Sequence, residues 1–297
     1  MIIKYFIFFL IAVNIFIPML VINIFTFWLE KPIFSGLEIS LWIKETGEIR
    51  NIPFEEYITQ VTYAEIPASF EKEAIKSQAI AVRSYTYTKL KKNSHENCDM
   101  CNDINHCQAW READNTEYYK KILGAVEETK GRVATYNHEV IEAVYHASSG
   151  GSTEDAINVW NSHEDYLIAV ESPEEEKIMK DFEVEQIVTK KEFLDKLNFK
   201  KLENIKIISK TEGERVKEIL VNDKIFTGNE IRKIFNLRSS NFKIIEKNGN
   251  IIFKVKGYGH GVGLSQWGAQ AMALDGKTCD EIIKHYYTGV EIVNSEY

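Results

Sequence analysis

The chain has 297 residues and a formal net charge of −8, with 36 Lys and Arg against 44 Asp and Glu. A chain of this length holds one large domain or two small ones. Its acidic balance excludes nucleic acid from the expected partners, because a polyanion is repelled by a surface of the same sign. Acidic residues gather at 171–185 and lysines at 189–256, and such runs are typical of solvated surface.

The N-terminal segment from Tyr5 to Leu29 contains no charged residue and is rich in Phe, Ile, Leu and Val. As a helix it would reach about 37 Å, which exceeds the roughly 30 Å of a bilayer core. Lys4 precedes it, and the positive-inside tendency places that end in the cytoplasm. We therefore expect a single-pass membrane protein, with residues 1–30 as cytoplasmic tip and anchor and 31–297 outside. A cleaved signal peptide is the alternative, but no small residues mark a cleavage site.

Residues 37–66 alternate apolar and polar side chains around a Thr-Gly pair, which predicts a β-hairpin followed by a short helix or strand. Residues 70–92 have the strongest helical pattern, with Ser69 as N-cap and one apolar face. Local helices and hairpins together predict an α+β domain, with residues 171–256 as a smaller lobe. Strands are expected within 133–148 and 203–256, and further helices at 116–132, 191–198 and 227–235. A Gly-rich loop and two helices are expected in 256–289.

The stretch YAEIPASFEKEAIKSQAIAVRSY, residues 63–85, places Glu65 between Ala and Ile just before the long helix. Apolar neighbours disfavour the ionised carboxylate and raise its pKa, as a general acid requires. Lys76 and Arg83 lie along one edge of that helix, where they would face a groove and hold an anionic or hydroxyl-rich substrate. The alternative is ordinary: a Glu before a helix, and two cations extended beside an apolar stripe.

The stretch YHASSGGSTEDA, residues 145–156, follows a predicted strand and places Tyr145, His146, Ser148 and Ser149 before two glycines. A hydrolase triad with a Ser nucleophile and His146 as base is disfavoured, because the sequence shows neither a third triad residue nor a strand-to-helix turn that would expose the nucleophile. Substrate contacts and a plain turn both remain open for this loop.

The stretch GYGHGVGLSQWGAQAMA, residues 257–273, has glycines at alternate positions, which let a backbone approach a ligand closely. It is neither a P-loop nor a dinucleotide-binding fingerprint. His260, Ser265, Gln266 and Trp267 supply polar and stacking groups that are typical of a sugar site. The alternative is a tight turn packed on the following helix.

The stretch HENCDMCNDINHC, residues 95–107, contains three of the four cysteines and two of the seven histidines. Three interpretations remain open for this segment: a closed tetrahedral zinc site, two disulfides formed by these three cysteines and Cys279, or neither of the two. Cys98 and Cys101 have the spacing of a zinc knuckle. The interleaved histidines favour zinc, and a closed site would act as a structural staple and not as the catalytic centre.

Three of these segments together resemble the stage II sporulation protein D (SpoIID) family: AEIPASFEKEAIKSQAIAVRSYT, YHASSGG and GYGHGVGLSQWGAQAMA. The resemblance spans residues 37–292 and implies a peptidoglycan lytic transglycosylase. Such a lyase cleaves peptide-stripped glycan strands between MurNAc and GlcNAc and leaves 1,6-anhydro-MurNAc ends. The resemblance places the catalytic acid at Glu65 and supporting cations at Lys76 and Arg83. It implies a substrate groove lined by Tyr145, His146, Ser148, Ser149, His260, Ser265 and Gln266.

The resemblance also implies a biological setting and a metal site. The setting is engulfment during sporulation, in the mother-cell membrane facing the septal space, with stage II sporulation protein P as partner amidase and stage II sporulation protein M. The pattern His-x5-Cys-x4-His-Cys of relatives with a metal here implies structural zinc. Its ligands would be His95, Cys101, His106 and Cys107, with Cys98 spare.

Two other functions compete with the lytic transglycosylase. The first is a non-catalytic glycan-binding module that stimulates a cell-wall amidase, which would share the groove but not require Glu65. The second is a zinc amidase that uses the cluster at 95–107. Zinc amidases need an open coordination position and usually His with a carboxylate, so a Cys-rich cluster disfavours that reading.

Overall fold

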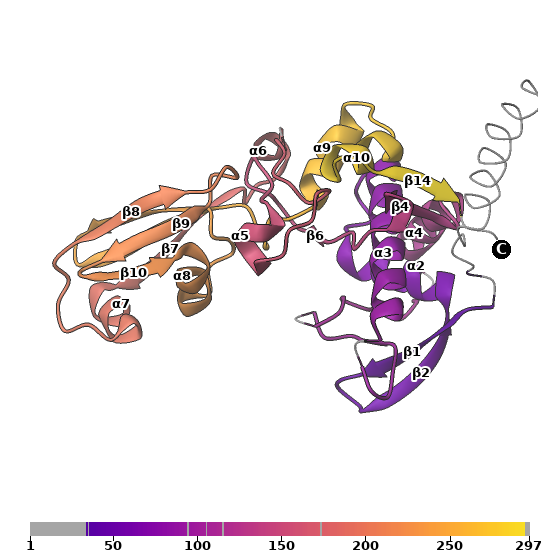
Figure 1. Ribbon diagram of the computed structural model, residues 1–297, viewed down its shortest axis with the longest axis horizontal. Helices are drawn as coiled ribbons and strands as arrows, with labels where there is room; N and C mark the ends of the chain where they lie inside the picture. Colours follow the sequence, from indigo (N-terminus) through magenta and orange to yellow (C-terminus); the bar gives the residue numbers. More distant parts are fainter. Residues whose placement is uncertain are drawn as a thin grey trace, which may run out of the picture.

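The computed structural model describes residues 34, 36–93, 95–104, 106–114, 116–172 and 174–294, and the fold is given for these residues. They form two lobes (Figure 1). The main body, drawn at the right, combines helices with small sheets, and the second lobe extends from it as a sheet-rich arm. Each lobe has a hydrophobic core of its own.

The main body begins with an antiparallel hairpin of β1 (Glu38–Ile43) and β2 (Glu48–Pro53), which confirms the predicted hairpin. The short strand β3 (Met100–Cys101) lies parallel to β1 and so brings the Cys-rich segment to this sheet. Of the two alternatives left open after the hairpin, the structure has a helix, α2 (Phe54–Glu65). Glu65 is the last residue of α2 and precedes the turn that leads into the next helix.

The central helix of the main body is α3 (Lys72–Lys92), and α2, α4 (Glu117–Glu128), α9 (Gln266–Leu274) and α10 (Cys279–Tyr286) pack around it. The predicted apolar face is confirmed, because Ile75, Ala79, Val82 and Thr86 are all buried. The predicted cap is wrong. The N-cap is Glu71, whose backbone N–H donates to the side chain of Gln270 at 2.6 Å, so contact with α9 fixes the start of α3.

Two small sheets complete the main body. One contains β4 (Arg132–Tyr136), β5 (Glu139–Val140) and β14 (Glu291–Asn294), all antiparallel. The other pairs β6 (Tyr145–His146) in parallel with β13 (Leu264–Ser265). This second pairing joins the two segments that the sequence singled out, although they lie far apart along the chain. Two short helices, α5 (Ala156–Trp160) and α6 (Glu175–Ile178), follow β6.

The second lobe contains two antiparallel three-stranded sheets and two helices, with its core built from residues between Val188 and Val255. In the first sheet β12 lies between β7 and β11, and in the second β9 lies between β8 and β10. Each helix is capped by a threonine at its N-terminus. The elements are β7 (Glu183–Thr189), α7 (Lys190–Leu197), β8 (Ile205–Lys210), β9 (Val216–Val221), β10 (Lys224–Thr227), α8 (Gly228–Phe235), β11 (Phe242–Lys247) and β12 (Asn250–Lys256).

A buried arginine joins the second lobe to the main body. The Arg215 guanidinium donates to the backbone carbonyls of Ser149 at 2.8 Å and Ser152 at 2.9 Å. Gly261 lies directly against it with φ +88°, and a Cβ there would fall 2.0 Å from the Arg215 Nη2 atom. One of the alternating glycines is therefore needed for this close approach between backbone and guanidinium.

The predicted membrane anchor requires a correction. Within the described part of the chain no helix is long and apolar enough to cross a membrane. The longest, α3, has 21 residues but carries seven charged side chains, which a bilayer core does not accommodate. The predicted transmembrane segment, residues 5–29, lies outside the described residues. The mixed α+β class is retained, but the single transmembrane helix and the assignment as a single-pass membrane protein are not supported.

Candidate active site

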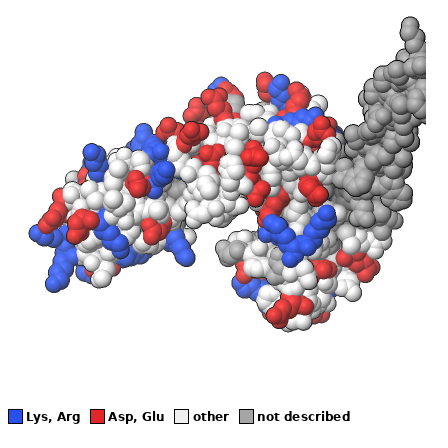
Figure 2. Space-filling view, in the orientation of Figure 1, with Lys and Arg blue, Asp and Glu red and all other residues white. Residues whose placement is uncertain are grey.

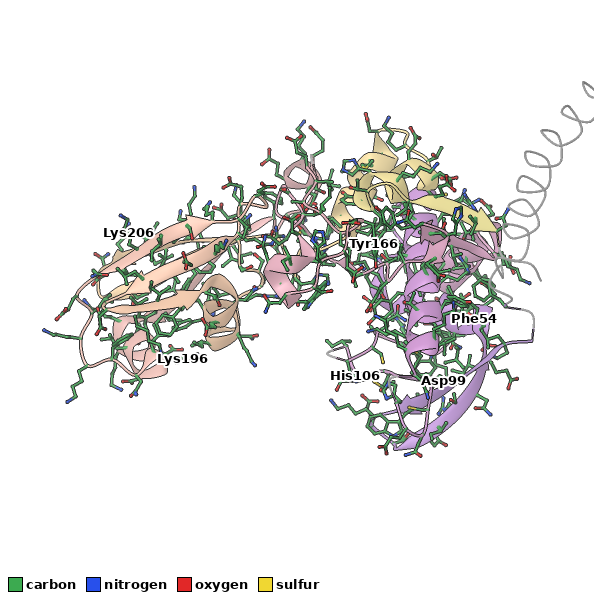
Figure 3. All side chains as sticks on the ribbon, viewed as in Figure 1. Phe54, Asp99, His106, Tyr166, Lys196 and Lys206 are labelled. Atoms are coloured by element: carbon green, nitrogen blue, oxygen red, sulfur yellow. The ribbon has the colours of Figure 1, made fainter. Side chains whose placement is uncertain are left out.

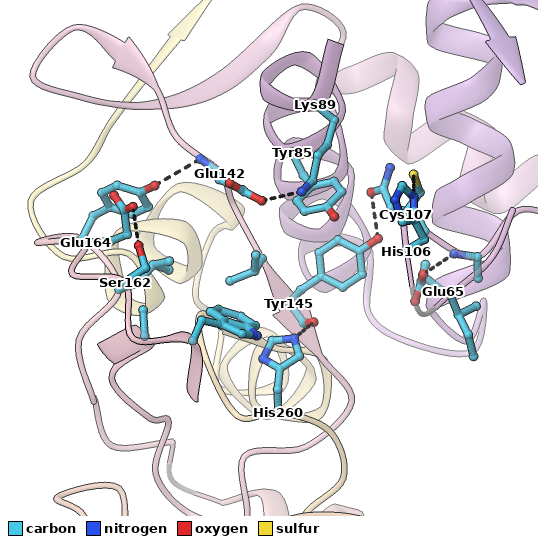
Figure 4. Close-up of a pocket in the computed structure, with 18 residues that line it drawn as sticks. Glu65, Tyr85, Lys89, His106, Cys107, Glu142, Tyr145, Ser162, Glu164 and His260 are labelled. Carbon is cyan, nitrogen blue, oxygen red and sulfur yellow. Dashed lines mark hydrogen bonds and ion pairs between the residues drawn. The ribbon is translucent and has the colours of Figure 1, made fainter. Parts of the chain in front are cut away.

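A cleft of about 770 Å³ opens in the main body and contains the predicted catalytic residue (Figure 4). This volume falls within the range of about 300–1,000 Å³ that is typical of ligand sites. In Figure 4 Glu65 lies at one end, Glu142 and Glu164 lie at the other, and Tyr145 and His260 lie between them. The cleft thus has a single carboxyl group at one end and two at the other.

Glu65 is held at the end of α2 by three hydrogen-bond partners. The backbone N–H of Ala109 donates to its Oε1 at 2.8 Å, and the side chains of Tyr145 and Gln266 also hydrogen-bond to it. Burial raises the pKa of Glu65 above its usual value, and these hydrogen bonds oppose the shift only in part. The raised pKa agrees with the expectation from its apolar neighbours, and the carboxyl can remain protonated closer to neutral pH.

Tyr145 links the carboxyl group to the loop that follows the Cys-rich segment. Its hydroxyl hydrogen-bonds to Glu65 and donates to Gln108 Oε1 at 2.9 Å, and the Gln108 amide donates to Thr86 on α3 at 2.9 Å. Burial, followed by the charge of Glu65, holds the pKa of Tyr145 well above its usual range. The hydroxyl therefore keeps its proton and acts as a hydrogen-bond donor in the cleft.

His260 forms part of the cleft wall in a fixed orientation. Its Nδ1 accepts the backbone N–H of Val262 at 3.1 Å, so the proton lies on Nε2, which donates to the carbonyl of Tyr145 at 2.9 Å. Burial lowers the pKa of His260 to about 4, which keeps the imidazole neutral at physiological pH. His146 lies behind it, fully buried, with ring centroids 5.5 Å apart, and does not line the cleft.

The two Ser-containing loops meet at a buried carboxylate that sequence reasoning missed. Glu175 accepts hydrogen bonds from the hydroxyls of Ser148 at 2.5 Å, Ser149 at 2.6 Å, Ser265 at 2.7 Å and Ser172 at 2.6 Å. These serines are buried and do not line the cleft. Glu175 lies in the acidic run that the sequence predicted to be solvated, so that expectation is wrong at this position.

Lys76 and Arg83 are not brought to the cleft. Arg83 is fully buried, and its Nε and Nη2 donate to the two carboxylate oxygens of Glu55 at 2.9 and 2.8 Å. Lys76 forms an ion pair with Glu73 at 2.7 Å. The lysine that lines the cleft is Lys89, and its Nζ lies 2.8 Å from Glu142 Oε1. Both predicted cations therefore pair with carboxylates, and neither lines the cleft.

The Cys-rich segment brings together the four residues that the resemblance implied. The ligand atoms of His95, Cys101, His106 and Cys107 all lie within 4.8 Å of one another, and Cys98 is not in this group. A turn in which the N–H groups of His106 and Cys107 donate to the Asp103 carbonyl creates the arrangement. All four cysteines of the chain are free thiols, so no disulfide competes for them. The cluster can hold a metal ion, and His106 and Cys107 also border the cleft.

The segment that carries the carboxyl at the end of α2 matches a known class of proteins. A family model described as "Stage II sporulation protein" matches residues 43–136, which include Glu65 and the four clustered residues. The chain is 34% identical over 278 residues to Stage II sporulation protein D of Bacillus subtilis (strain 168), covering 88% of this chain and 80% of that protein. The chain therefore belongs to the SpoIID family, as the resemblance indicated.

Other relatives extend the comparison. The chain is 33% identical over 277 residues to Stage II sporulation protein D of Bacillus amyloliquefaciens, covering 88% of this chain and 80% of that protein. It is also 27% identical over 286 residues to a protein named Amidase enhancer from Bacillus subtilis (strain 168), covering 77% of this chain and 39% of that protein.

Proposed function

We propose that the protein is a lytic transglycosylase that cleaves peptide-stripped peptidoglycan strands between MurNAc and GlcNAc. The observation that supports this is the position of Glu65 in the cleft, half-buried, with a raised pKa and three hydrogen-bond partners around it. Hydrolytic glycosidases need two carboxyl groups about 5–9.5 Å apart. The other carboxylates of the cleft lie at its opposite end, across Tyr145 from Glu65 (Figure 4).

A single carboxyl group suffices if no water enters the reaction. Protonated Glu65 gives its proton to the glycosidic oxygen as the bond from that oxygen to C1 of MurNAc breaks. The 6-hydroxyl oxygen of the same MurNAc forms a new bond to C1 and closes the 1,6-anhydro ring. Glu65, now a carboxylate, takes the hydroxyl proton and returns to its starting state. Atoms and charge balance without any further reactant.

The residues around Glu65 have distinct roles in this proposal. Tyr145 and Gln266, together with the Ala109 N–H, orient the carboxyl and stabilise its ionised form after the proton has left. Neutral His260 supplies a fixed wall and not an acid or base, because both ring nitrogens are engaged with the backbone. We retain Glu65 as the catalytic residue, whereas Lys76 and Arg83 have no substrate contact in this proposal.

The test is to incubate the full-length protein with peptide-free glycan strands and to weigh the products. Anhydro-MurNAc ends, lighter than hydrolysed ends by one water, are expected with the wild type. Glu65→Gln should lower the rate by at least about 100-fold, because a general acid contributes 100-fold or more. Glu142→Gln, at a carboxylate of the same cleft that pairs with Lys89, is the matched control and should give anhydro ends at saturating substrate. Hydrated ends, or full activity of Glu65→Gln, would overturn the mechanism.

A second function, stimulation of a cell-wall amidase by glycan binding without cleavage, is favoured by the similarity to Amidase enhancer. It uses the same cleft but does not require the carboxyl of Glu65. Strand binding without cleavage, together with unchanged stimulation by Glu65→Gln, would support it. Anhydro products that depend on Glu65 would exclude it as the sole function.

We also propose that the metal held by the His/Cys cluster is zinc. Two thiolates and two imidazoles are a typical structural zinc set, and tetrahedral bonds of about 2.0–2.3 Å place such ligand atoms roughly 3.3–3.8 Å apart. The separations of 3.2 Å from His95 Nε2 to Cys107 Sγ and 3.6 Å from Cys101 Sγ to His106 Nδ1 lie close to this range, and all four ligand atoms lie within 4.8 Å of one another. The site has four protein ligands and no open position, so its role would be to hold the loop that carries Gln108 and Ala109.

Metal analysis of two cysteine variants tests the ligand set. Cys101→Ser should lose the metal, whereas Cys98→Ser, the matched control outside the cluster, should retain one zinc per chain. Equal loss from both variants would contradict the assignment.

The biological setting follows from family membership and from this proposed activity. We propose that the protein acts in engulfment during sporulation, on strands that a partner amidase, stage II sporulation protein P, has stripped of stem peptides. Stage II sporulation protein M would be a further partner. Co-purification of both proteins with the wild-type chain from sporulating cells is the expected result, and their absence would remove this part of the proposal.

A further inference from the structure

An exposed tryptophan lies in the cleft and takes no part in the steps proposed above. Trp160 is the last residue of α5, lines the cleft, and leaves 46% of its surface exposed. Its ring centroid lies 5.0 Å from that of His260, with the planes at 53°. Two rings thus form one wall of the cleft, and the exposed ring surface is available to a ligand.

This wall is rigid. His260 cannot rotate without breaking its hydrogen bonds to the backbone of Tyr145 and Val262. The helix that carries Trp160 is tied to buried Glu154, whose Oε1 accepts the Asn158 amide at 2.8 Å. A preformed aromatic wall binds a ligand without the entropy cost of ordering a mobile side chain.

The chemistry of the wall matches one face of a sugar ring. The C–H bonds of a pyranose carry partial positive charge, and the face of an indole ring is its negative region, so the two attract. Polar groups for the hydroxyls of the same sugar come next in the chain, since Ser162 and Glu164 also line the cleft. An aromatic wall with polar groups at its edge is the arrangement that a glycan requires.

Tyr145 connects this wall to the catalytic end of the cleft. Its backbone carbonyl accepts the His260 N–H, and its hydroxyl hydrogen-bonds to the Glu65 carboxyl. We propose that Trp160 and His260 form a stacking platform for a sugar ring adjacent to the bond on which Glu65 acts. The inference rests on the proposed function and adds a residue that determines substrate affinity.

Equilibrium binding of peptide-free glycan strands to the full-length protein tests the platform. Glu65→Gln serves as the parent, so that the strands are not consumed during a calorimetric titration. Adding Trp160→Ala should raise Kd by about tenfold, which corresponds to about 1.4 kcal/mol. Trp160→Phe keeps an aromatic face and should stay within about threefold of the parent. Ile157→Ala is the matched control, because Ile157 is on the same helix and 43% exposed but does not line the cleft.

The outcomes separate the platform from the activity. An unchanged Kd for Trp160→Ala, or an equal loss with Ile157→Ala, would overturn the platform while leaving cleavage by Glu65 intact. A wild-type protein that neither binds nor cleaves the strands would overturn the proposed function itself. Thermal unfolding of each variant confirms that a change in Kd does not arise from loss of the fold.

Discussion

The buried carboxylate of Glu175 leads to a quantitative prediction about stability. It accepts hydrogen bonds from four serine hydroxyls and from the backbone N–H of Ser149 at 3.1 Å. Through them it holds together the loop after β6, Ser172 just before α6, and Ser265, which ends β13 and caps the N-terminus of α9. The packing is close, since a Cβ on Gly268 would lie 3.0 Å from the Glu175 carboxylate and 2.2 Å from Ser172 Oγ.

Replacing Glu175 by Gln preserves the shape but removes the charge. Hydrogen bonds to a charged group contribute about 1.5–3 kcal/mol each and are not additive. Serine hydroxyls can rotate to accept from the new NH2 group, but the Ser149 N–H cannot. We therefore expect a loss of about 2–3 kcal/mol for Glu175→Gln. Glu175→Ala, which removes the acceptor that the four serine hydroxyls share, should lose about 3–5 kcal/mol.

Tryptophan fluorescence gives a clean assay, because none of the five tryptophans lies in the second lobe, residues 183–256. At about 2–4 °C per kcal/mol, Glu175→Gln should lower the unfolding midpoint of the main body by roughly 4–12 °C. The matched control is Glu176→Gln, the exposed neighbour, which should stay within about 0.5 kcal/mol of the wild type. Equal midpoints for the two variants would show that Glu175 does not stabilise the loops as argued.

Three further predictions concern residues placed by the structure. Arg83→Met removes the two charge-assisted hydrogen bonds from the guanidinium to the Glu55 carboxylate and should cost about 3–5 kcal/mol in chemical unfolding, with KM for glycan strands unchanged. A raised KM in a folded variant would restore Arg83 as a substrate contact. Gly261→Ala places a methyl group against Arg215 at positive φ and should lower the free energy of unfolding by more than about 2 kcal/mol. The expected readout is faster proteolysis between the lobes, and an unchanged rate of proteolysis would argue against this packing. Because burial raises the pKa of Glu65 in the folded state, its ionisation opposes folding as pH rises from the ordinary carboxyl pKa through that raised value. Glu65→Gln should therefore raise the thermal unfolding midpoint at pH 7, but not at a pH below the ordinary carboxyl pKa. The rate at which the wild type cleaves glycan strands should fall as pH rises through the raised pKa. An equal gain in midpoint at both pH values would contradict this reasoning.

Sequence patterns were informative about charge in the second lobe, to which Lys196 and Lys206 both belong (Figure 3). In Figure 2 the lysines and arginines of the second lobe are spread over its visible surface, as the sequence indicated for the lysine-rich range. The same reasoning was wrong for Glu175, because local composition does not report a distant cluster of hydroxyls. Four serines, two of them more than 20 residues before it and one 90 residues after it, make its burial possible.

The sequence by itself determined the elements whose signals are local. The hairpin and the buried face of α3 follow from neighbours within a few positions along the chain. The four residues of the metal cluster lie within 13 positions, so spacing and family resemblance sufficed to select them.

Only the tertiary structure decided which charged groups face the cleft. Arg83 and Lys76 have the residue types of substrate contacts, yet each pairs with a carboxylate and neither lines the cleft. Trp160, Tyr145 and Glu65 come from three separate segments and meet because β6 pairs with β13 and the loop after the metal cluster folds over α2. The sequence gives only the chemical type of each side chain. Its partner and its burial depend on contacts between residues that are far apart along the chain, and these contacts set its free energy of ionisation.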